Sequence, residues 1–262
     1  MKKVEYKNLN FTLEDNIAIV TLNRPKYYNA LNSELIGELE KVLAELENND
    51  KVRVLIITGS GKAFAAGADV TELMEADPWG ALENCTRAHR VFDRLETLPI
   101  PTIAAINGPA LGGGCELILC CDFRIAAESA RIGLPEITLG IIPGAGGTQR
   151  LLRLVGLPRA KEMIFLGSLV NAEKALEIGL VDRIVNDQEL LEEAKKLAGK
   201  LIERPKIALK LAKNAINFWR DKDLESSKKF EMAQFALAFC TQDQKEGMRA
   251  FVEKRKPSFV HK

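Results

Sequence analysis

Short, nearly continuous runs of apolar residues recur along the first half of the chain. Residues 16–22 (NIAIVTL), 52–58 (VRVLIIT) and 102–107 (TIAAIN) each have the length and composition of a β-strand. The second and third runs have few polar positions, which is typical of strands that helices cover on both faces of a sheet. Two shorter strands are predicted at residues 123–127 and 131–133.

Between these runs the apolar residues take on helical spacing. From Leu35 to Leu46 they fall on one face of a helix, and Asn32 or Ser33 is suited to cap its N-terminus. A longer helix is predicted over residues 78–98. A strand, a glycine-containing loop and a helix follow one another twice, and this alternation predicts an α/β fold in which helices pack on a sheet.

The strand patterns stop at about Leu190. Four helices are predicted after this point, at residues 190–204, 206–219, 224–240 and 243–255. Around residues 230–240 apolar positions surround the helix on almost all sides, so this helix must be buried on its own core or on another subunit. Because the helix lies in an appendage, contact with another subunit is favoured. We predict a catalytic core of residues 1–195 and an oligomerisation region of residues 196–262.

The balance of charges argues against a nucleic-acid-binding protein. The 262 residues include 37 Lys and Arg against 36 Asp and Glu, a formal net charge of +1, whereas nucleic-acid binding normally needs a clear basic excess. No apolar stretch follows the N-terminal lysines, and no run of about 18 apolar residues occurs, so we expect no signal peptide and no membrane partner. The five cysteines form no CxxC pair, and we expect reduced thiols in a cytoplasmic protein.

Several kinds of catalytic site are excluded by what the sequence lacks. Only two histidines occur, His89 within a predicted helix and His261 beside the C-terminus. Neither suits a Ser-His-Asp triad, a Cys-His dyad or a His-rich metal site. There is no GxSxG motif, and the glycine-rich segments 59–62, 112–114 and 144–147 complete neither a phosphate-binding loop nor a GxGxxG motif. Carboxylates and backbone N–H groups remain as the expected catalytic groups.

Two glutamates lie in informative positions. Glu116 follows residues 112–114 and begins a helix, where free N–H groups can bind an anion or an oxyanion. Alternatively, Glu116 is an N-terminal glutamate that the helix dipole favours. Glu136 follows Pro135 among apolar residues, so it is either an exposed turn residue or a buried acid with a raised pKa. Two carboxyl groups in different environments can act as a base and an acid.

Five segments carry a resemblance to a known enzyme family. They are NRP and NALN within residues 23–32, KAFAAGAD at 62–69, NGPALGGGCEL at 107–117, LPEITLGIIPGAGGTQRL at 134–151 and EGMRAFVEKRKPSF at 246–259. In these segments, which occur in the family's order from end to end, the chain resembles the crotonase (enoyl-CoA hydratase/isomerase) family. One position departs from a common family pattern, because Leu134 stands where many hydratases have glutamine.

The resemblance implies a fold and an activity. The fold is a spiral of ββα turns followed by a C-terminal helical trimerisation region, with homotrimers that often pair into hexamers. The activity is reversible syn addition of water to a short-chain trans-2-enoyl-CoA, near crotonyl-CoA, to give a 3-hydroxyacyl-CoA such as 3-hydroxybutyryl-CoA. No cofactor is expected, because coenzyme A is part of the substrate and the thioester itself makes the adjacent carbon acidic.

The resemblance also implies roles for individual residues. Glu116 would activate the water, and Glu136 would deliver a proton to C2 of the acyl group. The backbone N–H groups of Ala68 and Gly113 would form the oxyanion hole. The N–H group of Gly144 would help to position the water.

Coenzyme A is expected to lie along the loop that contains one of the oxyanion donors. The residues expected to contact it there are Ala66, Gly67, Ala68 and Asp69. Arg24, Lys26 and Lys62 flank the neighbouring loops, so they are either contacts for the phosphates of coenzyme A or ordinary solvated charges. Trp79 either lines the acyl pocket or caps a helix.

Two other functions compete with hydration. A double-bond isomerase of the same family typically works with one carboxylate, so the presence of both Glu116 and Glu136 favours hydration. A crotonase-fold scaffold that binds RNA or a protein partner would be indicated by loss of a glutamate or by a basic face, and the sequence shows neither.

Overall fold

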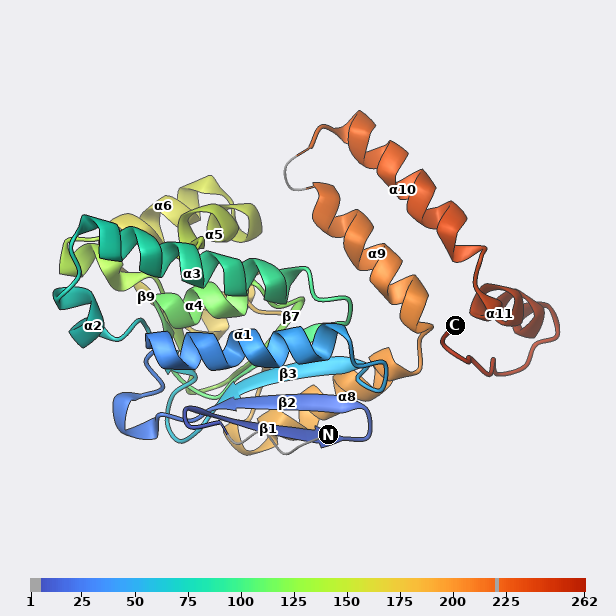
Figure 1. Ribbon diagram of the computed structural model, residues 1–262, viewed down its shortest axis with the longest axis horizontal. Coiled ribbons are helices and arrows are strands. Elements are labelled where there is room, and N and C mark those ends of the chain that lie inside the picture. Colours follow the sequence, from blue (N-terminus) through green and yellow to red (C-terminus); the bar gives the residue numbers. More distant parts are fainter. Residues whose placement is uncertain (1–5, 220–221) are drawn as a thin grey trace.

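A computed structural model describes residues 6–219 and 222–262 and shows two β-sheets with helices around them (Figure 1). The larger sheet has the strand order β1-β2-β3-β5-β7-β10, in which β1 is antiparallel to β2 and the other neighbours are parallel. Its strands are β1 (Leu9–Glu14), β2 (Ile17–Leu22), β3 (Val54–Gly59), β5 (Thr102–Ile106), β7 (Phe123–Ala127) and β10 (Arg183–Val185).

The second sheet is made of very short strands. They are β4 (Ala65–Ala66), β6 (Ala110–Leu111), β8 (Arg131–Gly133) and β9 (Leu169–Asn171). Their order is β4-β6-β8-β9, with β4, β6 and β8 parallel to one another. Each of three successive turns of the chain therefore adds one strand to each sheet before a helix follows. This repeated β-β-α step confirms the predicted spiral of ββα turns.

Eleven α-helices are present in the described residues. They are α1 (Ser33–Glu47), α2 (Val70–Met74), α3 (Pro78–Glu96), α4 (Gly113–Leu119), α5 (Gly147–Val155), α6 (Leu157–Leu166), α7 (Ala172–Glu177), α8 (Leu190–Ile202), α9 (Lys206–Phe218), α10 (Leu224–Ala238) and α11 (Gln242–Val252). Three 3-10 helices complete the set: η1 (Pro25–Tyr27), η2 (Pro135–Leu139) and η3 (Asp187–Glu189). The side chain of Asn32 accepts a hydrogen bond from the N–H of Leu35 at 2.9 Å, which confirms the predicted N-cap of α1.

The large sheet is covered on both faces, as the apolar runs predicted. In β3, Leu55 and Ile57 pack with the side chains of α1 and α3, whereas Val54 and Ile56 face α8. All four side chains are fully buried. A strand that is buried on both faces needs no polar alternation, and this explains the continuous apolar sequence of β3.

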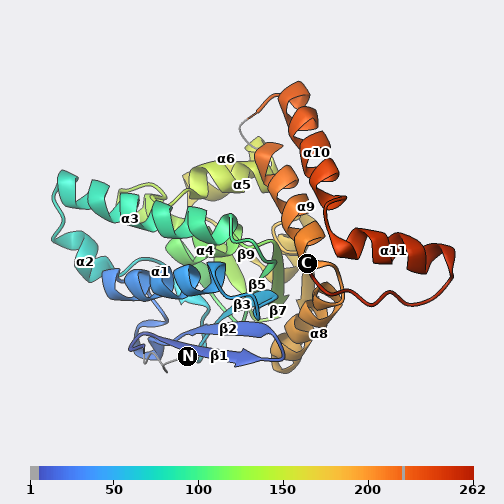
Figure 2. The ribbon, with the colours of Figure 1, turned by 45° about the vertical axis from the view of Figure 1, so that its right-hand side comes forward.

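The C-terminal helices α9, α10 and α11 extend away from the two sheets, as Figures 1 and 2 show. Polar contacts join α9 to the core: Lys213 Nζ lies 2.7 Å from Asp122 Oδ2, and Asn217 Nδ2 donates to the backbone oxygen of Glu96 at 3.0 Å. Helix α10 lies along α9, and the rings of Phe218 and Phe230 stack with centroids 4.1 Å apart.

The predicted boundary between residues 195 and 196 falls inside α8. This helix packs as one unit against the sheet through Leu190, Ala194, Leu197 and Ala198. In the structure, the helices that extend from the core begin with α9. The first five residues of the predicted core lie outside the described residues. Within the described chain, no helix has the length and apolar character that crossing a bilayer requires.

Candidate active site

Three site segments meet because they follow neighbouring parallel strands. Strand β4 pairs with β6, and β6 pairs with β8. Their carboxyl ends therefore lie side by side, the usual place for ligand sites in α/β folds. The segments that leave these ends carry Ala68, Gly113 and Glu136. The N–H of Gly112 donates to the backbone oxygen of Gly133 at 2.9 Å, which extends the pairing into the site.

The N–H groups of Ala68 and Gly113 are placed to act together. An ideal Cβ on Gly113 would lie 3.5 Å from the backbone nitrogen of Ala68, so the two segments are in contact. Ala68 forms a parallel bridge with Leu31 in which the N–H groups of Leu31 and Asp69 are the donors, so the N–H of Ala68 points elsewhere. Gly113 is the first residue of α4, where an N–H has no partner within the helix. Both donors are available to an oxygen atom between them.

Glycine is required where these segments touch. An ideal Cβ on Gly114 would lie 2.2 Å from the backbone oxygen of Ala65, so α4 approaches β4 more closely than any other residue would allow. Gly112 has φ +50°, a conformation that other residues rarely adopt, and an ideal Cβ there would lie 3.0 Å from Glu136 Oε1. The triple glycine thus brings α4 against β4 and leaves space for the Glu136 carboxyl group.

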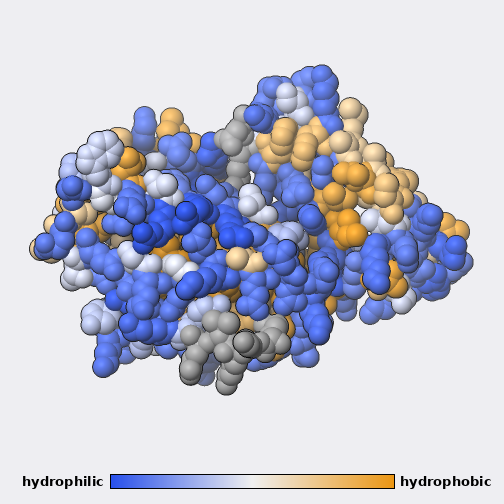
Figure 3. Space-filling model, viewed as in Figure 1, coloured by the Kyte–Doolittle hydropathy of each residue, from blue (hydrophilic) through white to orange (hydrophobic). Residues whose placement is uncertain are grey.

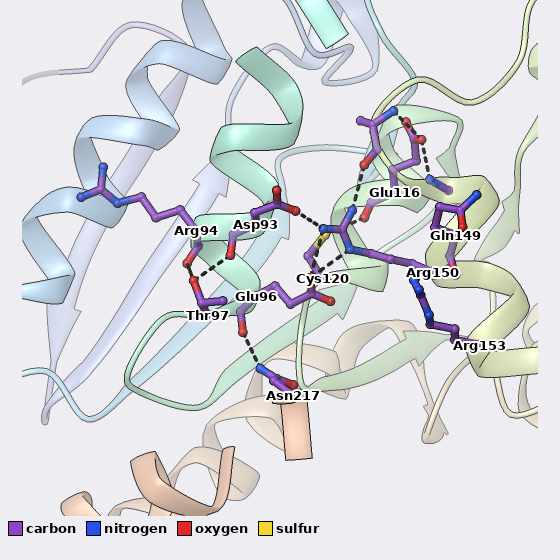
Figure 4. Close-up of polar contacts among 12 residues, drawn as sticks. Asp93, Arg94, Glu96, Thr97, Glu116, Cys120, Gln149, Arg150, Arg153 and Asn217 are labelled. Carbon is purple, nitrogen blue, oxygen red and sulfur yellow. Dashed lines mark hydrogen bonds and ion pairs between the residues drawn. The ribbon is translucent and has the colours of Figure 1, made fainter. Parts of the chain in front are cut away.

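Glu116 is buried and held by the turn before α5 (Figure 4). Its Oε1 accepts hydrogen bonds from the N–H groups of Ala145 at 2.7 Å and Gly147 at 2.8 Å. Burial raises the pKa of Glu116, while these two N–H groups and the nearby His89 and Arg150 act to lower it. The carboxyl group of Glu116 therefore binds N–H groups of another segment and not those at the start of its own helix α4. This geometry fits a catalytic role for Glu116 better than a role in stabilising the dipole of α4.

Glu136 is half-buried in η2, immediately after the Pro135 that begins the element. Burial, with a further contribution from the charge of Glu116, raises the pKa of Glu136 to about 7. Its Oε2 is buried and has no hydrogen-bond partner in the described residues. A carboxyl group in this state holds a proton near neutral pH and can donate it.

Gly144 lies beside α3, in the turn whose next residues hold Glu116. An ideal Cβ on Gly144 would lie 2.9 Å from Cys85 Sγ, so α3 borders the site at this point. The side chain of Leu134 is fully buried, and its Cδ1 lies 3.0 Å from an ideal Cβ on Gly147. At the position where many hydratases have glutamine, this chain therefore packs an apolar side chain against the turn that holds Glu116.

The chain is similar to known proteins over almost its whole length. The model of the family described as enoyl-CoA hydratase/isomerase matches residues 12–262. The chain belongs to this family. It is similar to the crotonyl-CoA hydratase of Syntrophomonas wolfei, with 46% identity over 98% of this chain and 99% of that protein. It is also 46% identical to the short-chain-enoyl-CoA hydratase of Clostridium acetobutylicum, over 97% of each protein.

Solved structures of the enoyl-CoA hydratase/isomerase family have the same fold. The enoyl-CoA hydratase from Bacillus anthracis is 42% identical, with a TM-score of 0.94 over 98% of this chain and 100% of that chain. A second structure, from Geobacillus kaustophilus, is 44% identical, with a TM-score of 0.95 over 99% of this chain and 100% of that chain. Both the family and the fold predicted from the sequence are confirmed.

The cationic residues expected at the coenzyme A loop differ in environment. Arg24 is nearly buried: it donates to Asp69 Oδ2 at 2.9 Å and to the backbone oxygen of Ala30, and its guanidinium lies 4.8 Å from the centroid of the Tyr27 ring. Arg24 therefore holds the loop before α2 in place. The side chains of Lys26 and Lys62 are exposed.

The remaining loop residues and Trp79 are placed as follows. Ala66 and Ala68 are half-buried, and Gly67 is buried with φ +95°. Asp69 caps α2 by accepting from the N–H of Thr71 at 3.2 Å. Trp79 lies in the first turn of α3 with 77% of its surface exposed. The side chain that caps this helix is that of Asp77, which accepts from the N–H of Gly80 at 2.7 Å, so the interpretation of Trp79 as a cap is wrong.

Several residues around Glu116 were not predicted from the sequence. They are Cys85, His89, Ala145, Gly147 and Arg150. The last three lie in the family motif at residues 134–151, but the sequence alone gives no sign of which N–H groups bind Glu116. The helical spacing of Cys85 and His89, four residues apart, was the available signal that one face of α3 meets the site.

Proposed function

We propose that this chain is an enoyl-CoA hydratase that adds water to a short-chain trans-2-enoyl-CoA, with crotonyl-CoA as the preferred substrate. The proposal is carried by one observation: the carboxyl groups of Glu116, which is buried, and Glu136, which is half-buried, lie beside the backbone N–H groups of Ala68 and Gly113. The names of the relatives from Syntrophomonas and Clostridium support the reaction and the short acyl chain.

In the proposed reaction, the ionised Glu116 removes a proton from a water molecule while the oxygen of that water bonds to C3 of the acyl group. Glu116 Oε1 is fixed by the N–H groups of Ala145 and Gly147, which leaves Oε2 for the water. We assign the N–H of Gly144, the preceding residue of the same turn, to the other side of the water. A general base that is held in place contributes about 10²–10⁴-fold to the rate.

As the water adds, negative charge moves to the thioester oxygen. The N–H groups of Ala68 and Gly113 receive that oxygen, and each such donor in a dry site lowers the barrier by roughly 2.7–4 kcal/mol. The protonated Glu136 then donates to C2, which completes the 3-hydroxyacyl-CoA. The thioester itself supplies the electron sink, so the proposed reaction requires no cofactor.

Coenzyme A is proposed to lie along residues 66–69. Lys26 and Lys62 are the cations we assign to its phosphates, because they are exposed beside this loop, whereas the contacts of Arg24 make it a support for Asp69.

We also propose a cytoplasmic location, which the five free cysteines support.

The rate of hydration should depend on pH through both glutamates. Glu116 must be ionised, so kcat/KM should fall as the pH drops below its pKa, which burial raises above the usual 4.5. Glu136 must be protonated, so kcat/KM should fall about tenfold per pH unit above its pKa of about 7. Loss of enoyl-thioester absorbance from pH 4 to 10 measures both limbs. A rate that stays constant up to pH 10 would contradict the role of Glu136 as the acid.

The competing function is double-bond isomerisation. It needs a single carboxyl group to move a proton between C4 and C2 and uses no water. Supplying 3-enoyl-CoA and 2-enoyl-CoA separately, in H₂¹⁸O, distinguishes the two activities. Incorporation of ¹⁸O into a 3-hydroxyacyl product is expected. If 3-enoyl-CoA is converted to 2-enoyl-CoA faster than 2-enoyl-CoA is hydrated, the isomerase assignment replaces the hydratase.

We predict that kcat/KM is highest for the C4 substrate and falls by C10. Each methylene that finds apolar cover adds about 0.8 kcal/mol of binding, so an open pocket would favour longer chains steadily. The α2–α3 segment borders the site through Cys85, and we assign to it the side chains that end the pocket. The measurement is the profile of kcat/KM for C4 to C16 enoyl-CoA substrates. A rise through C10 would contradict the prediction.

We also propose that the chain forms trimers or hexamers through its C-terminal helices. No side chain of α10 is buried, and Met232, Phe235 and Phe251 are 64%, 67% and 86% exposed. Figure 3 shows hydrophobic side chains gathered over the α10 end of the molecule. Exposed apolar area of this extent marks a surface that another chain covers. Light scattering at micromolar concentration should give the mass of three or six subunits, and a monomer would contradict the proposal.

A further inference from the structure

Arg150 links helix α3 to the turn that holds Glu116 (Figure 4). Its Nη1 donates to the backbone oxygen of Ala145 at 2.9 Å, while its Nε and Nη2 reach Glu96 Oε2 at 3.2 and 3.0 Å. Nη2 also pairs with Asp93 Oδ1. Ala145 is the residue whose N–H binds Glu116 at 2.7 Å. The carbonyl that Arg150 binds belongs to the peptide unit 145–146, which lies between the two peptide units whose N–H groups bind Glu116.

The contacts of Arg150 are buried and leave little freedom. The side chains of Arg150 and Glu96 are each 11% exposed. An ideal Cβ on Gly146 would lie 2.1 Å from Arg150 Nη1, and Gly146 has φ +102°. The turn thus adopts a left-handed conformation and folds directly against the guanidinium. The guanidinium holds a carbonyl and two carboxylates with donors in a fixed planar arrangement, and the ammonium of a lysine does not offer that arrangement.

Glu96 is itself fixed from the other side. It is the last residue of α3, where backbone carbonyl groups have no partner within the helix. Asn217 of α9 donates to the backbone oxygen of Glu96 at 3.0 Å. A continuous chain of hydrogen bonds therefore reaches Glu116. It runs from the end of α3 through the guanidinium of Arg150 to the turn at residues 145–147.

We propose that Arg150 is a positioning residue for the catalytic base: through Ala145 it fixes the N–H groups that orient Glu116, and it places a positive charge near that carboxyl group. This inference rests on the proposed role of Glu116. Arg150 touches neither the water nor the thioester in this scheme, so its loss acts on turnover and leaves substrate binding intact. A misplacement of about 1 Å in a catalytic group costs up to roughly a hundredfold in rate.

The test compares four variants of the full-length protein with crotonyl-CoA as substrate. Arg150→Met removes the support, and Arg150→Lys restores the charge without the planar group. Arg153→Met is the matched control, because Arg153 lies one turn further along α5 and is exposed. Glu116→Gln is included to test the base itself.

We expect Arg150→Met to lower kcat by roughly ten- to a hundredfold with KM within threefold of wild type. Arg150→Lys should recover part of that loss, and Arg153→Met should match wild type. Loss of the positive charge should also move the acid limb of the kcat profile to higher pH. The ionisable groups around Glu116 and Arg150 in the described residues are Cys85, His89, Asp93 and Glu96 on α3, Arg150 itself on α5, Glu136 on η2, and Cys115 and Cys120 on α4.

The outcomes separate this inference from the proposed function. If Glu116→Gln is inactive but Arg150→Met turns over like Arg153→Met with an unmoved acid limb, the positioning role is wrong. If Glu116→Gln keeps normal turnover, the assignment of the base is wrong instead.

A second variant applies if Arg150→Met fails to fold, as judged by thermal unfolding. Glu96→Gln keeps an oxygen for Arg150 but removes a negative charge from the support. It should lower kcat and move the acid limb to lower pH, because the charge of Arg150 then acts on Glu116 without Glu96 opposing it. An acid limb that stays in place would overturn the proposal.

Discussion

Replacement of Glu116 or Glu136 by glutamine should lower kcat for crotonyl-CoA hydration at least about a hundredfold, while acyl-CoA thioesters still bind. Glutamine keeps the size of each side chain and the hydrogen bonds from Ala145 and Gly147 to an oxygen at position 116. It cannot take a proton from water or give one to C2, and general acid–base catalysis typically contributes that much or more. Near-normal turnover of either variant would refute the two-glutamate mechanism.

Thermal unfolding distinguishes loss of chemistry from loss of fold in these variants. The folded-state pKa of Glu136 is raised from 4.5 to about 7, so ionisation of this group opposes folding. The cost is absent below the unfolded pKa and complete above the folded one. At pH 8, Glu136→Gln should therefore be more stable than wild type by about 1–2 kcal/mol, after allowance for the partial exposure of the carboxyl group. At pH 4 the two proteins should unfold at similar temperatures.

Gly114→Ala should lower kcat by at least roughly a hundredfold. The new Cβ would lie 2.2 Å from the backbone oxygen of Ala65 and 2.8 Å from its Cβ, so α4 has to move away from β4. That movement separates the N–H of Gly113 from the N–H of Ala68. Loss of a single oxyanion donor costs about 10²–10³ in kcat. Steady-state kinetics of the folded variant measures the effect.

Gly37→Ala is the control for this substitution. Gly37 lies within α1, and an ideal Cβ there meets nothing within 4 Å. Alanine in a helix interior is more stable than glycine by roughly 0.5–1 kcal/mol. The control should therefore unfold at a slightly higher temperature with unchanged kcat. Turnover of Gly114→Ala within threefold of this control would contradict the close approach of α4 and β4 as the basis of the oxyanion hole.

The parts of the fold predicted from the sequence are those with a strong local signal. Strands β2, β3, β5, β7 and β8, and helices α1, α3 and α8 to α11, lie within a few residues of their predicted bounds. Strand β1 was not predicted, because it is an edge strand in which only Leu9 is buried. Helix α6 was missed because Leu157, Phe165 and Leu166 are exposed, so its apolar residues mark no single buried face.

In the candidate site, too, the residues with a strong local signal were predicted, and the contacts between distant residues were not. Glu116 and Glu136 attract attention in the sequence because each is a carboxylate among glycines or apolar residues. The contacts of Arg150 with Asp93 and Glu96 join residues 57 and 54 positions apart, and no spacing rule relates such partners. The N–H groups of Ala145 and Gly147 carry no side-chain signature at all. Contacts of this kind become visible only when the strands and helices are in place.

The oxyanion hole that we propose for this protein is made of main chain, and this has a consequence for how the substrate preference can change. The N–H groups of Ala68 and Gly113 belong to the backbone. Their positions therefore depend on the pairing of β4 with β6 and on the glycines at 112–114 that follow β6. Side chains that border the acyl group do not determine where these two N–H groups lie. Libraries that randomise the α2–α3 segment should therefore yield hydratases with new chain-length preferences at high frequency, whereas libraries at positions 112–114 should return almost only glycine.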